Sequence, residues 1–399
     1  MKYFALSLLM ILSFTLVGLS VVQASEPAPA SDDQSVVQQR FLEEQLEKLG
    51  TSEVESFWEQ VKQEYGGYLP ENQPRTLSDF LTKEDSFFSF ELIKGFISYL
   101  FHELTVNGKL LGMIILLTVF SMILEQIQSA FESNNVSKVA YAVTYIVIFI
   151  IAINSFHVAV SYAKEAISSM VHFMMALVPM LLALIGATGQ VASVSLFHPL
   201  IIFLINTSGI MIYNIILPLL LFSSILGMVS AFSDYYRISQ LANLLRNISI
   251  GLLGIFLTIF LGVVSVQGAT VAVADGLTIR AAKFITSNFV PIVGRMFTDA
   301  TDTVLSASLL IKNTIGLAGV IILIVLAAFP ALKILTIGLI FNISAAVLQP
   351  LGNGSVITCL NVIGKNLLFV FAALATVCLM FFLGITIIIA AGNIAFMVR

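Results

Sequence analysis

Charged residues are scarce in this chain. Asp, Glu, Lys and Arg make up 11% of its 399 residues, whereas soluble proteins carry about 25%. A hydrophobic fraction of 58% and a mean hydropathy of +0.99 place the chain in the membrane class instead. It has no cluster of basic residues that could neutralise phosphates, so we expect no nucleic-acid partner.

Chemically reactive motifs are also missing. The two cysteines, Cys359 and Cys378, lie late in the chain, which leaves no disulfide framework for an exported segment. No Gly-rich loop ends in Gly-Lys-Ser or Gly-Lys-Thr, so an intrinsic ATPase is not expected. The histidines have no acidic partner at short helical spacing, and we therefore predict a non-enzyme without cofactor or metal; they are His102, His157, His172 and His198.

The N-terminus has the layout of an export signal. Residues 1–24 begin with Met1-Lys2, continue as an apolar run and end in Val22-Gln23-Ala24, which predicts a secretory signal peptide cleaved after Ala24. An uncleaved anchor helix is the alternative. In both cases the residues that follow lie on the extracytoplasmic side.

Residues 25–90 form an acidic region with helical patterns. A capping box at Ser52–Glu55 predicts the start of a helix, and Gly66-Gly67 predicts its end. An earlier helix is expected at 35–49. Large side chains share one face of the later helix, so we predict that it docks onto a partner or the membrane rather than serving as an acidic spacer; the candidate docking residues are Phe57, Trp58 and Tyr65.

Residues 91–107 alternate between apolar and charged positions at helical spacing. A helix with so broad an apolar face is predicted to lie in the plane of the membrane interface. Packing of this helix onto the membrane bundle is the alternative.

The remainder is dominated by long apolar runs. A run of about 20 residues suffices to cross the hydrocarbon core as a helix. Seven such runs predict an all-α polytopic membrane protein with Arg399 inside, and an eighth span at 284–297 would place Arg399 outside. The seven runs are 110–124, 139–159, 170–187, 199–232, 248–272, 314–349 and 366–397.

The prolines within these runs recur at a fixed spacing. Pro179 and Pro218 are 39 residues apart, as are Pro291 and Pro330. Such spacing predicts an internal duplication, although chance recurrence of common residues is the alternative. The chain then divides into two first transmembrane helices (108–169), membrane repeat 1 (170–274) and membrane repeat 2 with a polar linker (275–399). Each repeat also carries a basic-Asn pair and a Phe-Leu-Gly motif, at 246–247 and 260–262 and at 365–366 and 382–384.

A few polar residues stand inside the apolar runs. Lys333 follows Pro330 by three residues, and an ionisable group deep in a bilayer usually faces a cavity or a partner. The alternative is that Pro330 marks a turn and Lys333 reaches the headgroups. The predicted pathway residues are Lys333, Asn342, Asn206 and Asn214.

Several longer strings resemble one family. They are Phe57-Trp58, 64–70 (EYGGYLP), 99–103 (YLFHE), 107–112 (NGKLLG), 240–247 (QLANLLRN) and 294–303 (GRMFTDATDT). Through these strings the chain resembles the stage III sporulation protein AE family of endospore-forming bacteria, from the signal peptide to the C-terminal arginine.

The resemblance implies a polytopic protein made in the mother cell and placed in the outer forespore membrane. It implies action in a secretion-like channel with the other stage III sporulation A-operon membrane proteins and, indirectly, stage II sporulation protein Q. Such a complex supports forespore development after engulfment and late forespore gene expression. The residues themselves leave two further functions open, a secondary transporter of a small solute and a non-conducting membrane scaffold.

Overall fold

The computed structural model describes residues 51–70, 74, 90–130, 135–187, 190–232, 238–289, 293–351 and 354–397. Within these ranges all regular secondary structure is helical, as the sequence predicts. The predicted signal peptide and the helix expected at 35–49 lie outside the described residues, and so does Pro291.

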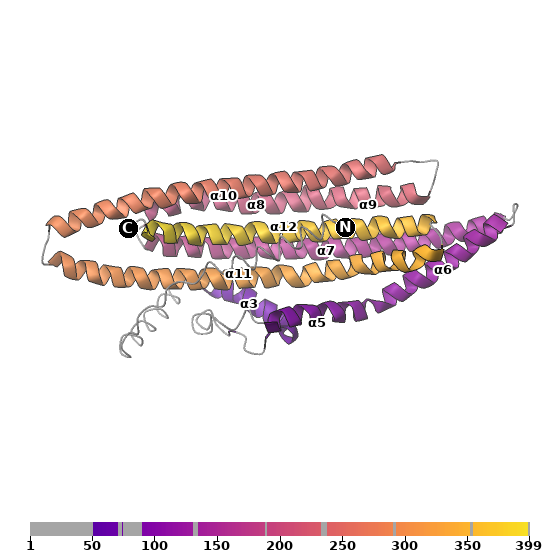
Figure 1. Cartoon of the computed structure of the whole chain (residues 1–399), viewed down its shortest axis with the longest axis horizontal. Helices are drawn as coiled ribbons and strands as arrows, with labels where there is room; N and C mark the ends of the chain where they lie inside the picture. The colour runs from indigo at the N-terminus through magenta and orange to yellow at the C-terminus, as the bar shows by residue number, and fades with distance from the viewer. Residues whose placement is uncertain are drawn as a thin grey trace. The chain divides into compact units, whose positions relative to one another are not determined.

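Six α-helices form the apolar bundle, and Figure 1 shows them lying side by side. Their sequences are rich in Leu, Ile, Val, Phe and Ala, which explains why they pack against one another over most of their length. Helix α11 packs against both α7 and α12 and contributes many of the fully buried side chains. The helices are α7 (Asn135–Ala187), α8 (Val191–Met211), α9 (Leu217–Phe232), α10 (Ser239–Phe289), α11 (Val293–Leu348) and α12 (Ser355–Met397).

The described ranges hold five or six helices that could span a membrane, compared with the about seven spans (six to eight) that the sequence predicts. Five helices in the described ranges are long and apolar enough to cross a membrane, or six if the bent pair Glu91–Val106 and Gly108–Leu124 is one span. The main cause is α7, which joins the predicted spans 139–159 and 170–187 into one helix. The residues between these spans include Lys164 and Glu165 but no Pro or Gly, so nothing in that stretch breaks the helix.

The prolines are accommodated without turns. Pro179 lies inside α7 and Pro330 inside α11, so the alternative that Pro330 marks a turn is wrong. A five-residue π-helical turn at Ile212–Ile216 precedes Pro218 and connects α8 to α9. Local widening of this kind absorbs the backbone hydrogen bond that a proline cannot donate.

A short N-terminal unit packs on the bundle. It comprises α3 (Ser52–Tyr65), a 3-10 turn (η1, Gly66–Tyr68) and α5 (Phe90–Val106), followed by α6 (Gly108–Ala130). The predicted helix at Ser52 and its end before Gly66 are confirmed. The predicted capping box is wrong, because Thr51 occupies the N-cap and no side chain caps the helix.

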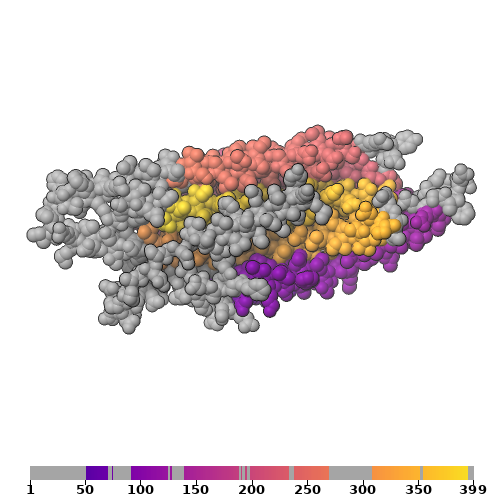
Figure 2. All heavy atoms as spheres, viewed as in Figure 1, coloured from indigo at the N-terminus to yellow at the C-terminus, as the bar shows by residue number. Residues whose placement is uncertain are grey.

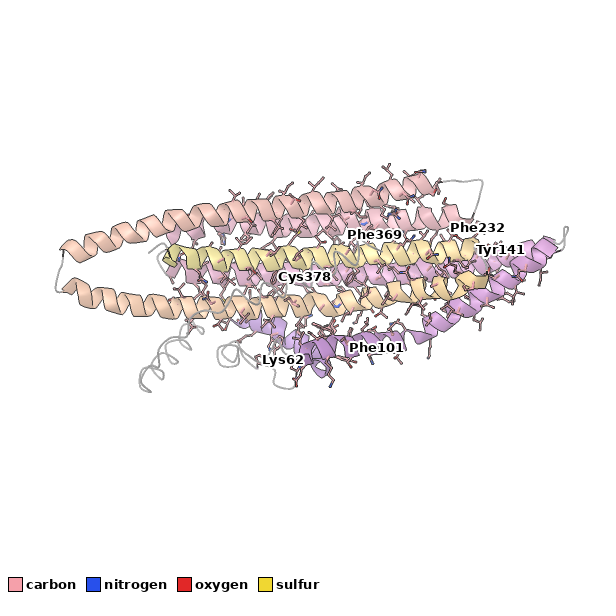
Figure 3. The ribbon with its side chains drawn as sticks, in the orientation of Figure 1. Lys62, Phe101, Tyr141, Phe232, Phe369 and Cys378 are labelled. Carbon is pink, nitrogen blue, oxygen red and sulfur yellow. The ribbon has the colours of Figure 1, made fainter. Side chains whose placement is uncertain are left out.

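Helix α5 has two apolar faces with different surroundings. Leu92 and Tyr99 are buried, and α5 packs against α11. Ile93, Ile97 and Phe101 are exposed, and Figure 3 labels Phe101 on α5. In Figure 2 α5 and α6 lie along one side of the bundle. Packing on the bundle therefore involves one face, while the other remains available to the membrane interface.

Gly95 is the point of closest approach between α5 and η1. A Cβ atom at this position would overlap the backbone carbonyl oxygen of Tyr68, which cannot move without displacing the turn. We predict that Gly95→Ala lowers the free energy of unfolding by about 1–3 kcal/mol, the usual cost of overpacking. Thermal unfolding of the detergent-solubilised protein measures this effect.

Gly112 in α6 provides the control, since a Cβ there would meet no atom within 4 Å. Gly112→Ala is expected to be neutral or stabilising, because alanine favours the helix. Equal unfolding temperatures for the two variants would show that the contact at Gly95 is not tight.

Candidate functional site at the junction of α3 and α11

An aromatic cluster joins the N-terminal unit to the bundle. Phe329 of α11 is fully buried, and its ring stacks on that of Tyr65 at a centroid distance of 4.1 Å. The rings of Tyr99 and Phe96 from α5 meet Phe329 edge-on at 4.8 and 5.3 Å. Such aromatic pairs add stabilisation beyond the buried area, so Phe329 is the common attachment point of α3 and α5.

The rest of α3 is held by its predicted apolar face. Val54, Trp58, Val61 and Tyr65 are all buried, and the ring of Phe57 lies 5.5 Å from that of Phe173 in α7. The Trp58 indole N–H donates a hydrogen bond of 2.7 Å to the carbonyl oxygen of Pro74. Two of the predicted docking residues, Phe57 and Tyr65, thus contact the bundle of the same chain, and the third, Trp58, is buried on the same helix.

Lys333 lies one turn beyond Phe329 and is paired with α3. Its ammonium nitrogen is 3.7 Å from the Glu64 carboxylate and 5.1 Å from the centre of the Tyr162 ring. Tyr65 donates a hydrogen bond of 2.6 Å to the same carboxylate. Burial, reinforced by Glu64, raises the pKa of Tyr65 above its usual value, so the hydroxyl remains a donor. Lys333 therefore meets a carboxylate and aromatic rings rather than hydrocarbon.

The outer face of α3 is acidic. Glu53, Glu59 and Glu64 are exposed, while the opposite face of the same helix is buried against α7 and α11. This is a helix with one side suited to the bundle and the other suited to water or a polar partner.

The other predicted pathway residues are not gathered at this junction. Asn206 and Asn342 each donate a hydrogen bond to the carbonyl four residues earlier in their own helix. Asn214 is exposed in the π-helical turn. No hydrogen bond or ion pair in the described part of the chain joins any of these to Lys333.

A second polar cluster, which the sequence analysis missed, lies near the start of the apolar part of α11. Lys312 is fully buried, and its ammonium donates to the Asn393 side-chain oxygen at 2.6 Å and to the Ile389 carbonyl at 3.3 Å. A Cβ on Gly392 would lie 2.6 Å from this nitrogen, so the glycine provides room for it. Gln190 donates to the Gly392 carbonyl at 3.0 Å, and its own side-chain oxygen is buried without a partner among the described residues.

Lys312 was overlooked because it stands at the boundary of an apolar run, where a lysine usually reaches water. One feature of the sequence could have indicated a buried polar partner for this lysine. A small residue and an amide residue, Gly392 and Asn393, stand together near the end of the last apolar run. Only the antiparallel packing of α11 and α12 brings them to Lys312.

Long apolar helices packed side by side, with polar clusters at particular levels, are typical of polytopic helical membrane proteins. The model of the stage III sporulation protein AE family matches residues 73–392. A curated relative, stage III sporulation protein AE of Bacillus subtilis (strain 168), is 53% identical over 399 residues and covers the whole of both chains. The chain therefore belongs to the stage III sporulation protein AE family, a family of sporulation proteins. No solved structure matches it.

Proposed function

We propose that this protein is a non-enzymatic membrane subunit of the secretion-like channel complex between mother cell and forespore. In this role it lies in the outer forespore membrane, residues 25–90 are exported, and α3 is reached from the extracytoplasmic side. It acts with the other stage III sporulation A-operon membrane proteins and, indirectly, with stage II sporulation protein Q. Family membership supports the sporulation role.

The position of α3 is the observation that carries the channel proposal. Lys312 and Lys333 are 21 residues apart on α11, about 31 Å along a helix, which equals the thickness of the hydrocarbon core. Helix α3 lies over the part of the bundle between them, because its Tyr65 stacks on Phe329 and its Phe57 meets Phe173.

Glutamates on the outer face of α3 therefore stand at the level of the apolar segments. Ionised side chains at that depth are strongly disfavoured in lipid. The part of this flank that α3 covers consequently faces water or a polar protein surface, as a subunit bordering a conduit requires, whereas the exposed apolar residues of the neighbouring α5 suit the membrane interface. The opposite side of the bundle suits lipid, since Phe203 of α8 and Ile255 and Ile259 of α10 are exposed there (Figure 1).

Thiol labelling tests this assignment. In a chain carrying Cys359→Ala and Cys378→Ala, we expect Glu59→Cys to react with a membrane-impermeant maleimide in sporulating cells or isolated membranes. The matched variant Ile259→Cys, on the exposed face of α10, is expected to remain unlabelled until detergent is added. Protection of position 59 in cells but not in purified membranes indicates a partner on this flank. Equal protection of both positions in membranes and in cells contradicts a polar flank.

Substitution of Lys333 distinguishes a channel subunit from a non-conducting scaffold. The Glu64–Lys333 pair is partly exposed, and such pairs contribute about 0–1 kcal/mol. We therefore expect Lys333→Gln to leave protein level and assembly with the operon partners unchanged. A transporter or conduit subunit should nevertheless lose heat-resistant spore formation, whereas a scaffold should retain it. Loss of the protein itself would instead show that Lys333 is structural.

A further inference from the structure

Helix α7 packs against α8 on one face and against α11 on another (Figure 1). In both pairs, residue numbers on α7 fall as those on the neighbouring helix rise. Both neighbours are therefore antiparallel to α7, so α8 and α11 run in the same direction along it. The contacts that show this are Val171 with Gly209 and Lys164 with Tyr213 on the side of α8, and Leu177 with Gly319 and Tyr162 with Lys333 on the side of α11.

A lysine and a tyrosine meet at the same level of α7 on both faces. On the side of α11, the ammonium of Lys333 lies 5.1 Å from the centre of the Tyr162 ring. On the side of α8, the ammonium of Lys164 lies 4.2 Å from the centre of the Tyr213 ring. Tyr162 and Lys164 are two residues apart and so point about 200° apart around α7. The two junctions therefore contain the same kind of contact, with the lysine and the tyrosine exchanged between the helices.

Helix α3 covers the junction of α7 with α11. Its Glu64 carboxylate lies 3.7 Å from the Lys333 ammonium. Its Tyr65 ring stacks on Phe329, which stands one turn before Lys333 on α11 and is 0% exposed. A carboxylate beside an aromatic ring is thus what this junction binds within its own chain.

The corresponding surface at the junction of α7 with α8 is exposed. Ile210 stands one turn before Tyr213, in the position that Phe329 has relative to Lys333, and it is 60% exposed. Tyr213 is exposed as well. Phe203, seven residues before Ile210 and on the same face of α8, is also exposed. These side chains give α8 an apolar strip beside Lys164.

Lys164 has no carboxylate partner in the part of the chain that the structure describes. It is half-buried, and Glu165 is its neighbour on α7, but adjacent residues on a helix do not face each other. Stretches without Asp, Glu, Lys or Arg extend along α7 on both sides of this pair, at 139–163 and 166–187. An ammonium group in so apolar a setting is disfavoured unless a carboxylate or another acceptor pairs with it.

We infer that the junction of α7 with α8 binds a transmembrane helix of a partner subunit, one that carries a carboxylate beside an aromatic residue. The carboxylate pairs with Lys164, and the aromatic ring covers Ile210 as Tyr65 covers Phe329. The apolar strip on α8 fits a helix whose remaining surface is apolar, which is why the occupant is a transmembrane helix rather than a second acidic helix like α3. The inference requires a membrane location for the chain but not the channel role.

Binding of a synthetic transmembrane peptide to the purified full chain in detergent tests the site. The probe is a leucine helix with Glu-Tyr at its centre and a fluorophore at one end, and the matched peptide has Gln-Tyr instead. Fluorescence anisotropy measures both affinities. We expect the Glu-Tyr peptide to bind roughly 5- to 30-fold more tightly, as a polar contact between membrane helices allows. Lys164→Gln should remove this preference, and Lys164→Glu should favour a Lys-Tyr peptide instead.

Lys365→Gln is the matched control, because Lys365 is an exposed lysine of α12 that forms no ion pair with any described residue. It should keep the preference of the parent. Equal binding of the two peptides by the parent overturns the inference, and this comparison needs no variant to fold. A preference that persists in Lys164→Gln, or that is lost in Lys365→Gln, overturns the assignment to this junction. None of these outcomes bears on the labelling of position 59, so the two proposals fail separately.

Discussion

Phe329→Ala is expected to release α3 and α5 from the bundle. The substitution removes a fully buried ring that contacts Tyr65, Phe96 and Tyr99. Truncating a buried phenylalanine costs about 3–5 kcal/mol, which is large compared with the other contacts of α3. The chain contains a single tryptophan, and that residue, Trp58, is buried on the same face of α3 as Tyr65. Its fluorescence emission should therefore shift to longer wavelength as it meets water.

Phe203→Ala is the matched control. Phe203 is 64% exposed, so its removal should leave the Trp58 emission and the unfolding temperature unchanged. An unshifted emission maximum for Phe329→Ala, in a protein that remains folded, would show that α3 does not depend on Phe329.

Asn393→Ala is expected to destabilise the far end of the bundle by about 1.5–3 kcal/mol. That is the typical worth of a hydrogen bond to a charged group, and the Lys312 ammonium loses one of its two acceptors. The remaining charge is buried without a carboxylate among the described residues, which increases the cost. The measurement is the shift in thermal unfolding of the purified protein in detergent.

A double-mutant cycle identifies the charge as the cause. Lys312→Met keeps the volume of the stem but removes the ammonium, and replacing a buried charge by an apolar group is often neutral or stabilising. In that background Asn393→Ala should cost less than about 1 kcal/mol, because no cation remains to be left unpaired. An equal cost in both backgrounds would show that Asn393 acts through packing alone.

The helices were predictable from residue patterns because lipid and the bundle core select for the same apolar side chains. The inward face of α3 followed from the spacing of Val54, Trp58, Val61 and Tyr65, which repeat at helical intervals. The continuity of α7 was not predictable in this manner. Lys164 and Glu165 stand between the two runs that were predicted as separate spans, but the helix continues through them, and the Lys164 ammonium contacts the Tyr213 ring.

The candidate site was only partly predictable. Lys333 stood out because it interrupts an apolar run, but its partner Glu64 is 269 residues away in the sequence, and tertiary packing alone joins them. Docking of Tyr65 within its own chain was missed for the same reason. A large aromatic residue on a short helix predicts that the helix docks onto another surface, but it does not indicate whether that surface belongs to a partner, to the membrane or to the same chain.

The acid-rich helix on one flank gives the protein two chemically different sides. The exposed surface of α8 and α10 is apolar and compatible with hydrocarbon, as at Phe203, Ile255 and Val266. The exposed carboxylates of Glu53 and Glu59 on α3 are strongly disfavoured in hydrocarbon. Such a protein is stable in a membrane only where one side meets lipid and the other side meets water or a polar protein surface. If the protein borders a conduit as proposed, the glutamates of α3, and no residue from the interior of the bundle, would face it.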